Sequence, residues 1–268
     1  MNTILIMHAL AVAGLLALGA RADESAPAAP AAESEPAAAT AAAELSAKDI
    51  LRRADESRGN LKGVRWVVDI DAKENGDQQV CSMDVSARGY DFLAMFLSPP
   101  KSKGQRVLQV DRNMWYTKPG VRKPVPISSR QKLVGGAAYG DIAATNYADD
   151  YEPTPLADEE VDGVLCYGFD LKAATKQSTY DRVKYWVSKD RCVAVKAEYY
   201  TVSGKMFKTA RFAFDQKVAV DGAEKPFISS ITITDAVMPD NVTVMAFSEP
   251  RLSSIPDSTF DVNLLMTR

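Results

Sequence analysis

The sequence predicts a mainly β protein, built as one antiparallel sheet of about 11–12 strands that curls into an incomplete barrel. Three observations predict this class. From residue 63 onward, apolar and polar residues alternate with a period of two in run after run. Few helical stretches separate these runs, so neighbouring strands are expected to pair as an antiparallel meander. A single sheet of this length must curl in order to bury its apolar face.

One helix is expected before the first strand. Ser46 is a good N-cap, and Asp49 follows three residues later as a weaker form of the capping box. Gly59 and Asn60 are expected to end the helix. Its apolar stripe consists of Ile50, Leu51 and Ala54.

The strands follow from the alternating runs and from the turns between them. Asn75-Gly76 separates the first two runs, and this dipeptide is a strong hairpin signal between alternating segments. The expected strands are residues 64–71, 80–85, 90–97, 106–111, 114–117, 164–171, 182–187, 193–199, 207–214, 227–234, 242–247 and 260–264.

Residues 118–155 interrupt this pattern with glycine and proline punctuation. Short helices are possible at residues 128–133 and 139–148. A long insertion within a compact sheet is usually functional, disordered, or a cover for an open face. We therefore expect a short helical lid in this insertion.

The N-terminal residues predict export. Residues 4–18 are almost continuously apolar, and Ala20-Arg21-Ala22 supplies a cleavage pattern, so we interpret residues 1–22 as a signal peptide. No Lys or Arg precedes the apolar run, which leaves an uncleaved anchor as the alternative. Residues 23–44 are rich in Ala, Pro, Glu and Ser and are expected to form a disordered linker. Residues 45–268 would form a single domain. Since no Cys lies near the cleavage point, we expect a periplasmic protein without a lipid anchor.

Composition excludes several functions. Removing Arg21 with the signal leaves 31 basic against 35 acidic residues, which argues against a nucleic-acid partner. The single histidine, His8, lies in the signal, so the exported chain would lack the usual general base near neutral pH. We therefore expect a protein that is not an enzyme. The cysteines Cys81, Cys166 and Cys192 suit three buried thiols, with one disulfide plus a free thiol as the alternative.

A family resemblance rests on several short motifs in order. They are Phe96-Leu97-Ser98-Pro99-Pro100, Lys103-Gly104, Asn113-Met114-Trp115-Tyr116, Arg122-Lys123-Pro124, the segment from Gly135 to Asp141, and the segment from Tyr147 to Glu152. This order resembles the LolA-like family of outer-membrane lipoprotein-sorting proteins, over roughly residues 46–268. The sequence departs from the family pattern at Gly140-Asp141-Ile142 and the following Ala143-Ala144, and at Tyr116-Thr117-Lys118-Pro119.

The resemblance implies a half-barrel closed by a lid, with an apolar cavity that carries acyl chains across the periplasm. It also implies carriers or binding modules rather than catalysts. The cavity lining would come from the inward positions of the strands and from adaptable methionines. The candidate residues are Trp66, Val68, Met83, Phe92, Met95, Met114, Trp115, Val195, Phe212, Phe214, Ile231 and Ile233. The alternative is that these residues simply form a packed core.

Charged residues supply two further candidate sites. The basic loop with Lys118, Arg122 and Lys123 would contact anionic headgroups or an acidic partner, unless it is only a solvated loop. The acidic runs at residues 149–152 and 158–160 lack the spacing of a calcium loop, so we interpret them as solvated surface.

The resulting functional prediction is a monomeric periplasmic carrier, without metal or cofactor, that binds acyl chains of lipoproteins or lipids and shuttles them toward the outer membrane. Its partners would include an inner-membrane transporter and an outer-membrane acceptor. The main alternative is a lipid-sensing or regulatory module that binds a membrane protein. A carboxylate hydrolase using Asp149 is a weaker third reading.

Overall fold

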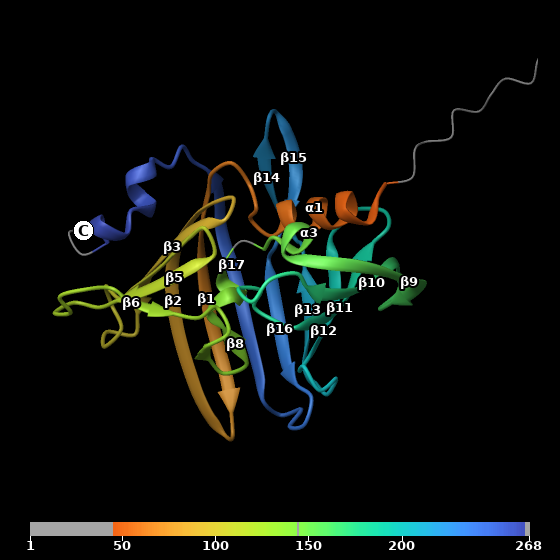
Figure 1. Ribbon diagram of the computed structural model, residues 1–268, viewed down its shortest axis with the longest axis horizontal. Helices are drawn as coiled ribbons and strands as arrows, with labels where there is room; N and C mark the ends of the chain where they lie inside the picture. Colours follow the sequence, from red (N-terminus) through yellow and green to blue (C-terminus); the bar gives the residue numbers. More distant parts are fainter. Residues whose placement is uncertain (1–44, 144, 266–268) are drawn as a thin grey trace, which may run out of the picture. The chain divides into compact units, whose positions relative to one another are not determined.

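The described part of the chain begins with one helix and continues almost entirely as strands (Figure 1). The computed structural model describes residues 45–143 and 145–265. The helices are α1 (Ala47–Ser57), α2 (Tyr139–Ile142) and α3 (Tyr147–Asp150), followed by the 3₁₀ helices η1 (Asp257–Phe260) and η2 (Val262–Leu264). The strands are β1 (Val64–Glu74), β2 (Asp77–Arg88), β3 (Asp91–Ser98), β4 (Arg106–Val110), β5 (Asn113–Thr117), β6 (Val125–Ile127), β7 (Lys132–Val134), β8 (Ala137–Ala138), β9 (Tyr151–Val161), β10 (Val164–Ala173), β11 (Arg182–Ser188), β12 (Ala194–Tyr200), β13 (Met206–Ala213), β14 (Gln216–Val220), β15 (Ala223–Phe227), β16 (Ser230–Asp235) and β17 (Val242–Leu252).

Thirteen strands form one sheet in the order β6-β5-β4-β3-β2-β1-β17-β16-β13-β12-β11-β10-β9. Every pairing in it is antiparallel, as local hairpins dictate. The first hairpin turns at Asn75 and Gly76, whose φ angles of 53° and 90° are those of a tight two-residue turn. Two pairings join strands that are not consecutive: β13 pairs with β16 across the β14–β15 hairpin, and β1 pairs with β17, which joins the first and last strands in the middle of the sheet.

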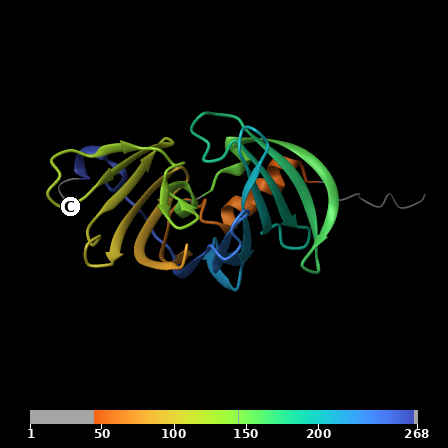
Figure 2. The same cartoon turned by 90° about the horizontal axis from the view of Figure 1, so that it is seen from below.

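This order makes β6 and β9 the two edges of the sheet. Both edges contain proline, which cannot donate a backbone hydrogen bond and is tolerated at an edge: Pro126 in β6, and Pro153 and Pro155 in β9. The sheet is strongly curved, and α1 with the α2–α3 region lies between its two arms (Figure 2). The predicted open, curled antiparallel sheet with an N-terminal helix is confirmed.

Several details differ from the sequence-based expectation. Residues 260–264 form no strand, because the chain there turns into η1 and η2 and packs its apolar side chains against the outside of the sheet. Residues 128–133 form no helix but a turn leading into β7. The single helix expected over 139–148 is instead two short helices, α2 and α3.

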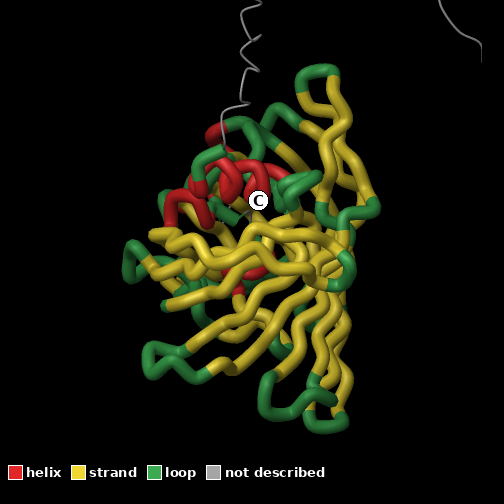
Figure 3. Tube along the Cα trace, turned by 90° about the vertical axis from the view of Figure 1, so that its right-hand side faces the viewer, coloured by secondary structure: helices red, strands yellow, loops and turns green. Residues whose placement is uncertain are grey.

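The strands that were not predicted lack a clean alternating pattern. Strand β9 is exposed along most of its length, so it shows little hydrophobic periodicity. The hairpin β14–β15 extends away from the main sheet (Figure 3), and its short strands pair only with each other. Hydrophobic patterning reports burial, and these segments bury little.

Helix α1 follows the predicted capping. The Ser46 side chain accepts a hydrogen bond from the Asp49 backbone N–H at 3.2 Å, and the apolar stripe of Ile50, Leu51 and Ala54 is buried. The helix packs against α3, β9, β11 and β15. It therefore fills part of the concave side of the sheet.

The outer face of strands β3–β5 is covered by the C-terminal segment. Leu108 forms a small core there with Ile255, Phe260 and Leu265. Residues 92–97 are apolar on both faces of the strand, and η1 and η2 supply part of the layer over the outer face.

The expected signal peptide, residues 1–22, and the expected linker, residues 23–44, lie outside the described residues. Within residues 45–143 and 145–265, no helix combines the length and the apolar character that crossing a membrane would require. Cys81, Cys166 and Cys192 are buried free thiols.

The cover on the outer face makes a testable contribution to stability. Phe260 is 5% exposed, so Phe260→Ala should lower the free energy of unfolding by about 3 kcal/mol through lost burial and a residual cavity. Urea denaturation measures this change. Val202→Ala, at a position that is 86% exposed, is the control and should change stability by less than about 0.5 kcal/mol. An equally small effect at Phe260 would contradict the assignment of the C-terminal segment as structural cover.

Candidate functional site

The concave face of the sheet carries most of the predicted ligand-binding residues. They belong to the main core and come from strands far apart in the sequence. The buried members are Trp66, Val68, Met83, Phe92, Met114, Phe214, Ile231 and Ile233, with Phe212 partly buried against them.

Three predicted lining residues lie elsewhere. Val195 packs with Val161, Cys166 and Trp186 because a β-bulge between β11 and β12 reverses the alternation that was expected for this strand. Trp115 packs on the outer-face core beside Leu108, since its neighbour in the strand takes the inward position. Met95 lines a small pocket near Leu265 on the same side. These three side chains therefore do not line the concave face.

The predicted basic loop lies between β5 and β6. Lys118, Arg122 and Lys123 are all exposed there. A role for them in binding headgroups or partners stays a prediction.

A lid formed by residues 132–143 and 145–150 occupies the concave face. Its apolar side chains are buried in the same core as the sheet residues. They include Val134, Ala137, Ile142, Tyr147 and Ala148. The space that was predicted for a ligand is thus filled by the protein's own lid in this structure.

The β7–β8 hairpin brings the lid into close contact with the sheet. A Cβ atom added at Gly135 would lie 2.3 Å from Thr243 Oγ1 and 2.5 Å from Ala72 Cβ, and the residue has a φ of 53°. Gly136 N–H donates a hydrogen bond to Thr243 Oγ1 at 2.8 Å. Glycine at residue 135 therefore permits both the turn and the close approach to β1 and β17.

A buried charged cluster joins α2 to β13. Lys208 Nζ lies 2.9 Å from Asp141 Oδ2, 2.6 Å from Tyr180 Oη and 2.9 Å from the Gly136 carbonyl oxygen. The side chains of Lys208 and Asp141 are each 5% exposed. Ala138 N–H and Tyr180 Oη also donate to the Asp141 carboxylate, at 2.8 Å each. Burial, with the Asp141 charge, raises the pKa of Tyr180 well above its ordinary value, so the phenol stays protonated as a donor.

A second polar contact joins α1 to α3. Ala148 N–H donates to Asp55 Oδ2 at 2.9 Å, and Asn60 Nδ2 donates to Asn146 Oδ1 at 2.5 Å. Burial raises the pKa of Asp55 to about 6, against the opposing effect of hydrogen bonds from the lid backbone. The lid is therefore attached to its surroundings by polar contacts at both of its helices.

Tyrosine rings surround the second contact. Tyr147 of α3 contacts Tyr151 and Tyr185 edge-on, with ring centroids 5.0 and 5.1 Å apart. The Arg58 guanidinium lies 5.6 Å from the centre of the Tyr147 ring and 4.8 Å from that of Phe212.

Four charged residues lie where the lid meets α1 and β13, and we call this contact the lid seam: Asp55, Arg58, Asp141 and Lys208. None of them was predicted as a site residue, although the sequence contains one indication of the buried ion pair. Lys208 stands at an inward position of an otherwise alternating strand, two residues before Ala210 and four before Phe212. A charge at such a position indicates a buried partner.

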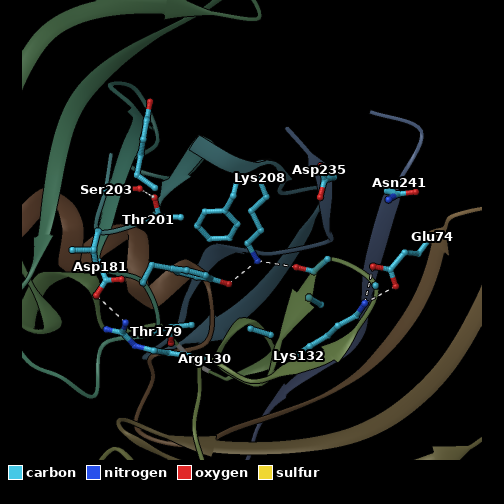
Figure 4. Close-up of a pocket in the computed structure, with 18 of the residues that line it drawn as sticks. Glu74, Arg130, Lys132, Thr179, Asp181, Thr201, Ser203, Lys208, Asp235 and Asn241 are labelled. Atoms are coloured by element: carbon cyan, nitrogen blue, oxygen red, sulfur yellow. Dashed lines mark hydrogen bonds and ion pairs between the residues drawn. The ribbon is translucent and has the colours of Figure 1, made fainter. Parts of the chain in front are cut away.

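A pocket opens beside the lid (Figure 4). Its volume is about 720 Å³, and it lies among the β7–β8 hairpin, residues 179–181 and the turn after β12. Two ion pairs lie at its rim: Arg130 with Asp181 at 2.8 Å, and Lys132 with Glu74 at 2.6 Å. Lys208 reaches the same pocket, so the buried cluster borders solvent-accessible space. Groups of three or more His, Cys, Asp or Glu placed to hold a metal ion do not occur among the described residues.

Lys208→Met should weaken the attachment of the lid. The variant leaves the Asp141 carboxylate buried without its cation, which should cost about 3–5 kcal/mol. Limited proteolysis should then cut faster within the lid than in the sheet, while urea denaturation reports the total loss.

The matched double variant is Lys208→Met with Asp141→Asn, which removes both charges and keeps an acceptor for Ala138 N–H. It should be destabilised less than the sum of the two single variants. Strict additivity would contradict a direct interaction between the two charges.

Asp55 predicts a pH dependence. Because its pKa is higher in the folded protein than the ordinary 3.8, its stabilising effect is present at low pH and is lost as the pH rises through about 6. Asp55→Asn should therefore gain stability relative to the parent protein between about pH 4.5 and 7.5, by about 2 kcal/mol. Thermal unfolding across this range measures the difference, with the exposed Asp77→Asn as control. A difference that does not change with pH would show that Asp55 does not titrate as described.

Comparison with known proteins supports the fold and the family resemblance. A family model described only as an uncharacterized protein matches residues 89–267. No curated protein matches the chain. A crystal structure of a LolA superfamily protein from Nitrosomonas europaea is 31% identical, with a TM-score of 0.73, covering 81% of this chain and 98% of that one.

Two more distant structures show the same fold. One is a putative outer membrane lipoprotein-sorting protein domain from Vibrio parahaemolyticus, 19% identical with a TM-score of 0.70, covering 82% of this chain and 97% of that one. The other is a DUF1329 family protein from Desulfovibrio piger, 21% identical with a TM-score of 0.68, covering 81% of this chain and 97% of that one.

Proposed function

The chain belongs to the LolA superfamily, and we propose that it binds acyl chains of lipoproteins or lipids on its concave face and carries them toward the outer membrane. One observation carries this proposal most directly. The apolar concave face is covered by a lid that contributes no strand to the main sheet. The lid can therefore leave the face without separating any pair of strands in that sheet.

An acyl chain could replace the lid because both bury apolar surface against the same residues. Burial of a methylene group contributes about 0.8 kcal/mol, so a chain of about sixteen carbons would gain on the order of 12 kcal/mol before the cost of displacing the lid. The lid's own apolar side chains and its buried ion pair set that cost. A carrier needs such a balance, because cargo that is held too tightly cannot be released to an acceptor.

The charged lid seam supports reversible closure. A buried ion pair stabilises much less than its Coulomb attraction suggests, because both charges lose their hydration. When the lid opens, Lys208 and Asp141 regain water, which repays part of the lost attraction. The open pocket beside Lys208 provides a route for that water.

The proposed place of action is the periplasm, reached through the N-terminal signal peptide. Loading by an inner-membrane transporter and delivery to an outer-membrane acceptor follow from the carrier role. The exposed loop with Lys118, Arg122 and Lys123 is the proposed contact for anionic headgroups or for an acidic partner. This is a binding function, and no catalytic step is proposed.

Lipid extraction tests the carrier role. Protein purified from the periplasm without detergent should yield acyl lipid at about one molecule per chain by mass spectrometry. Burial of the acyl chain, worth on the order of 12 kcal/mol before the cost of displacing the lid, should keep the lipid bound during purification. Delipidated protein should then take up a fluorescent fatty acid, and Lys208→Met should take it up faster because its lid opens more often. A protein that carries no acyl lipid, takes none up, and instead forms a tight complex with a membrane protein's periplasmic segment would favour a regulatory module.

A further inference from the structure

Arg58 is a buried cation without a carboxylate partner, and it faces the proposed cargo site. It follows α1 directly and is 6% exposed. Its Nη1 atom has no hydrogen-bond partner in the described part of the chain. Lys208, the other buried cation of the lid seam, has a carboxylate at 2.9 Å. Since buried polar groups are nearly always partnered, the unpartnered Nη1 of Arg58 calls for a physical explanation.

We propose that Arg58, together with the hydroxyl of Tyr185, binds the acidic headgroup of the cargo, so that the preferred ligand is an anionic amphiphile with a carboxylate or phosphate. This inference rests on the carrier role and deepens it by naming the class of ligand. A guanidinium presents parallel N–H groups that match the two oxygens of a carboxylate or phosphate.

The position of Arg58 couples this site to the lid. One aromatic neighbour of the guanidinium, Phe212, belongs to the sheet, and the other, Tyr147, belongs to α3 of the lid. When the lid leaves, Arg58 loses the Tyr147 ring and keeps the Phe212 ring. The cation is then open on the side from which an acyl chain would enter the concave face.

Tyr185 supplies the second element of the site. Its hydroxyl oxygen is buried beside the Arg58 guanidinium and interacts with it, yet it forms no well-aligned hydrogen bond within residues 45–143 and 145–265. Its ring contacts both Tyr147 and Phe212, which are the two rings that flank Arg58. Burial raises the pKa of Tyr185, so the phenol keeps its proton and can donate it in a hydrogen bond to an anion. Two adjacent donors, neither of which has a well-formed hydrogen bond, therefore lie in one aromatic enclosure.

Arg58 stays cationic although it is buried. Burial acts to lower the pKa of Arg58, but interactions with Tyr185, Tyr147 and Tyr199, including hydrogen bonding to Tyr185, outweigh this effect and raise it. Asp55 interacts with Arg58 electrostatically, yet the two form no ion pair, and Asp55 Oδ2 accepts from the lid backbone instead. The guanidinium thus keeps its full charge and has an empty donor position.

Paired ligands test the proposal. Purified, delipidated protein is titrated with oleate and with oleyl alcohol, which share a chain and differ in headgroup charge, at about pH 8, where a carboxyl group is ionised. The parent protein should bind oleate at least about tenfold more tightly than the alcohol. Arg58→Gln should abolish this preference and still bind the alcohol, and Tyr185→Phe should reduce the preference severalfold. Arg53→Gln, an equal charge change on the exposed face of α1, is the control and should keep the full preference.

The same comparison with phosphatidate and diacylglycerol distinguishes phosphate from carboxylate as the favoured group. Equal affinities for charged and neutral ligands in the parent protein would overturn the headgroup site and leave the carrier role intact. A preference that survives in both Arg58→Gln and Tyr185→Phe would also overturn it, and would assign Arg58 to packing between aromatic rings alone. A parent protein that binds none of the four ligands would overturn the carrier role and this inference together. Because Tyr185→Phe removes a single oxygen, the test stands even if Arg58→Gln does not fold.

Discussion

The pairing of β1 with β17 is the constraint on which the rest of the structure depends. It places the two ends of the strand series in the middle of the sheet, so the free edges are β6 and β9. The residues that connect those edges must cross the open side of a curved sheet. They join the hydrogen-bonded ladder of neither edge, since β7 and β8 pair only with each other, and they pack as a lid of two short strands and two short helices.

A lid placed in this way has to bury backbone and side-chain polar groups, because it lies on an apolar face. Its two helices have four residues each, and Asp141 and Asp55 accept hydrogen bonds from lid N–H groups. Lys208 then balances the charge of Asp141. The same residues that make the closed lid possible also make it separable, since they regain hydration when it opens. The unpaired Arg58 fits this scheme as a donor that the closed state leaves unused.

The strands with one apolar and one polar face were predictable from the sequence, because alternation directly reports which residues are buried. The edge strands β6 and β9 were not, since a mostly exposed strand with prolines has no such signal. Val195 shows a second limit: a bulge shifts the alternation by one residue, and the apolar residues at 193, 194 and 195 do not show at which of them the shift occurs. Most of the predicted lining residues do lie on the concave face. The charged seam was missed because a buried ion pair joins residues such as Asp141 and Lys208, whose proximity only the fold creates.

The central claim is that the lid leaves the concave face when an acyl chain occupies it. Hydrogen–deuterium exchange with and without bound fatty acid tests this most directly. When the fatty acid binds, amides of residues 132–143 and 145–150 should lose protection from exchange, while those of β1, β2, β16 and β17 should keep theirs. The sheet keeps its hydrogen bonds, because the acyl chain replaces only the lid that covers it. If the fatty acid binds and the lid amides keep their full protection from exchange, the claim is contradicted.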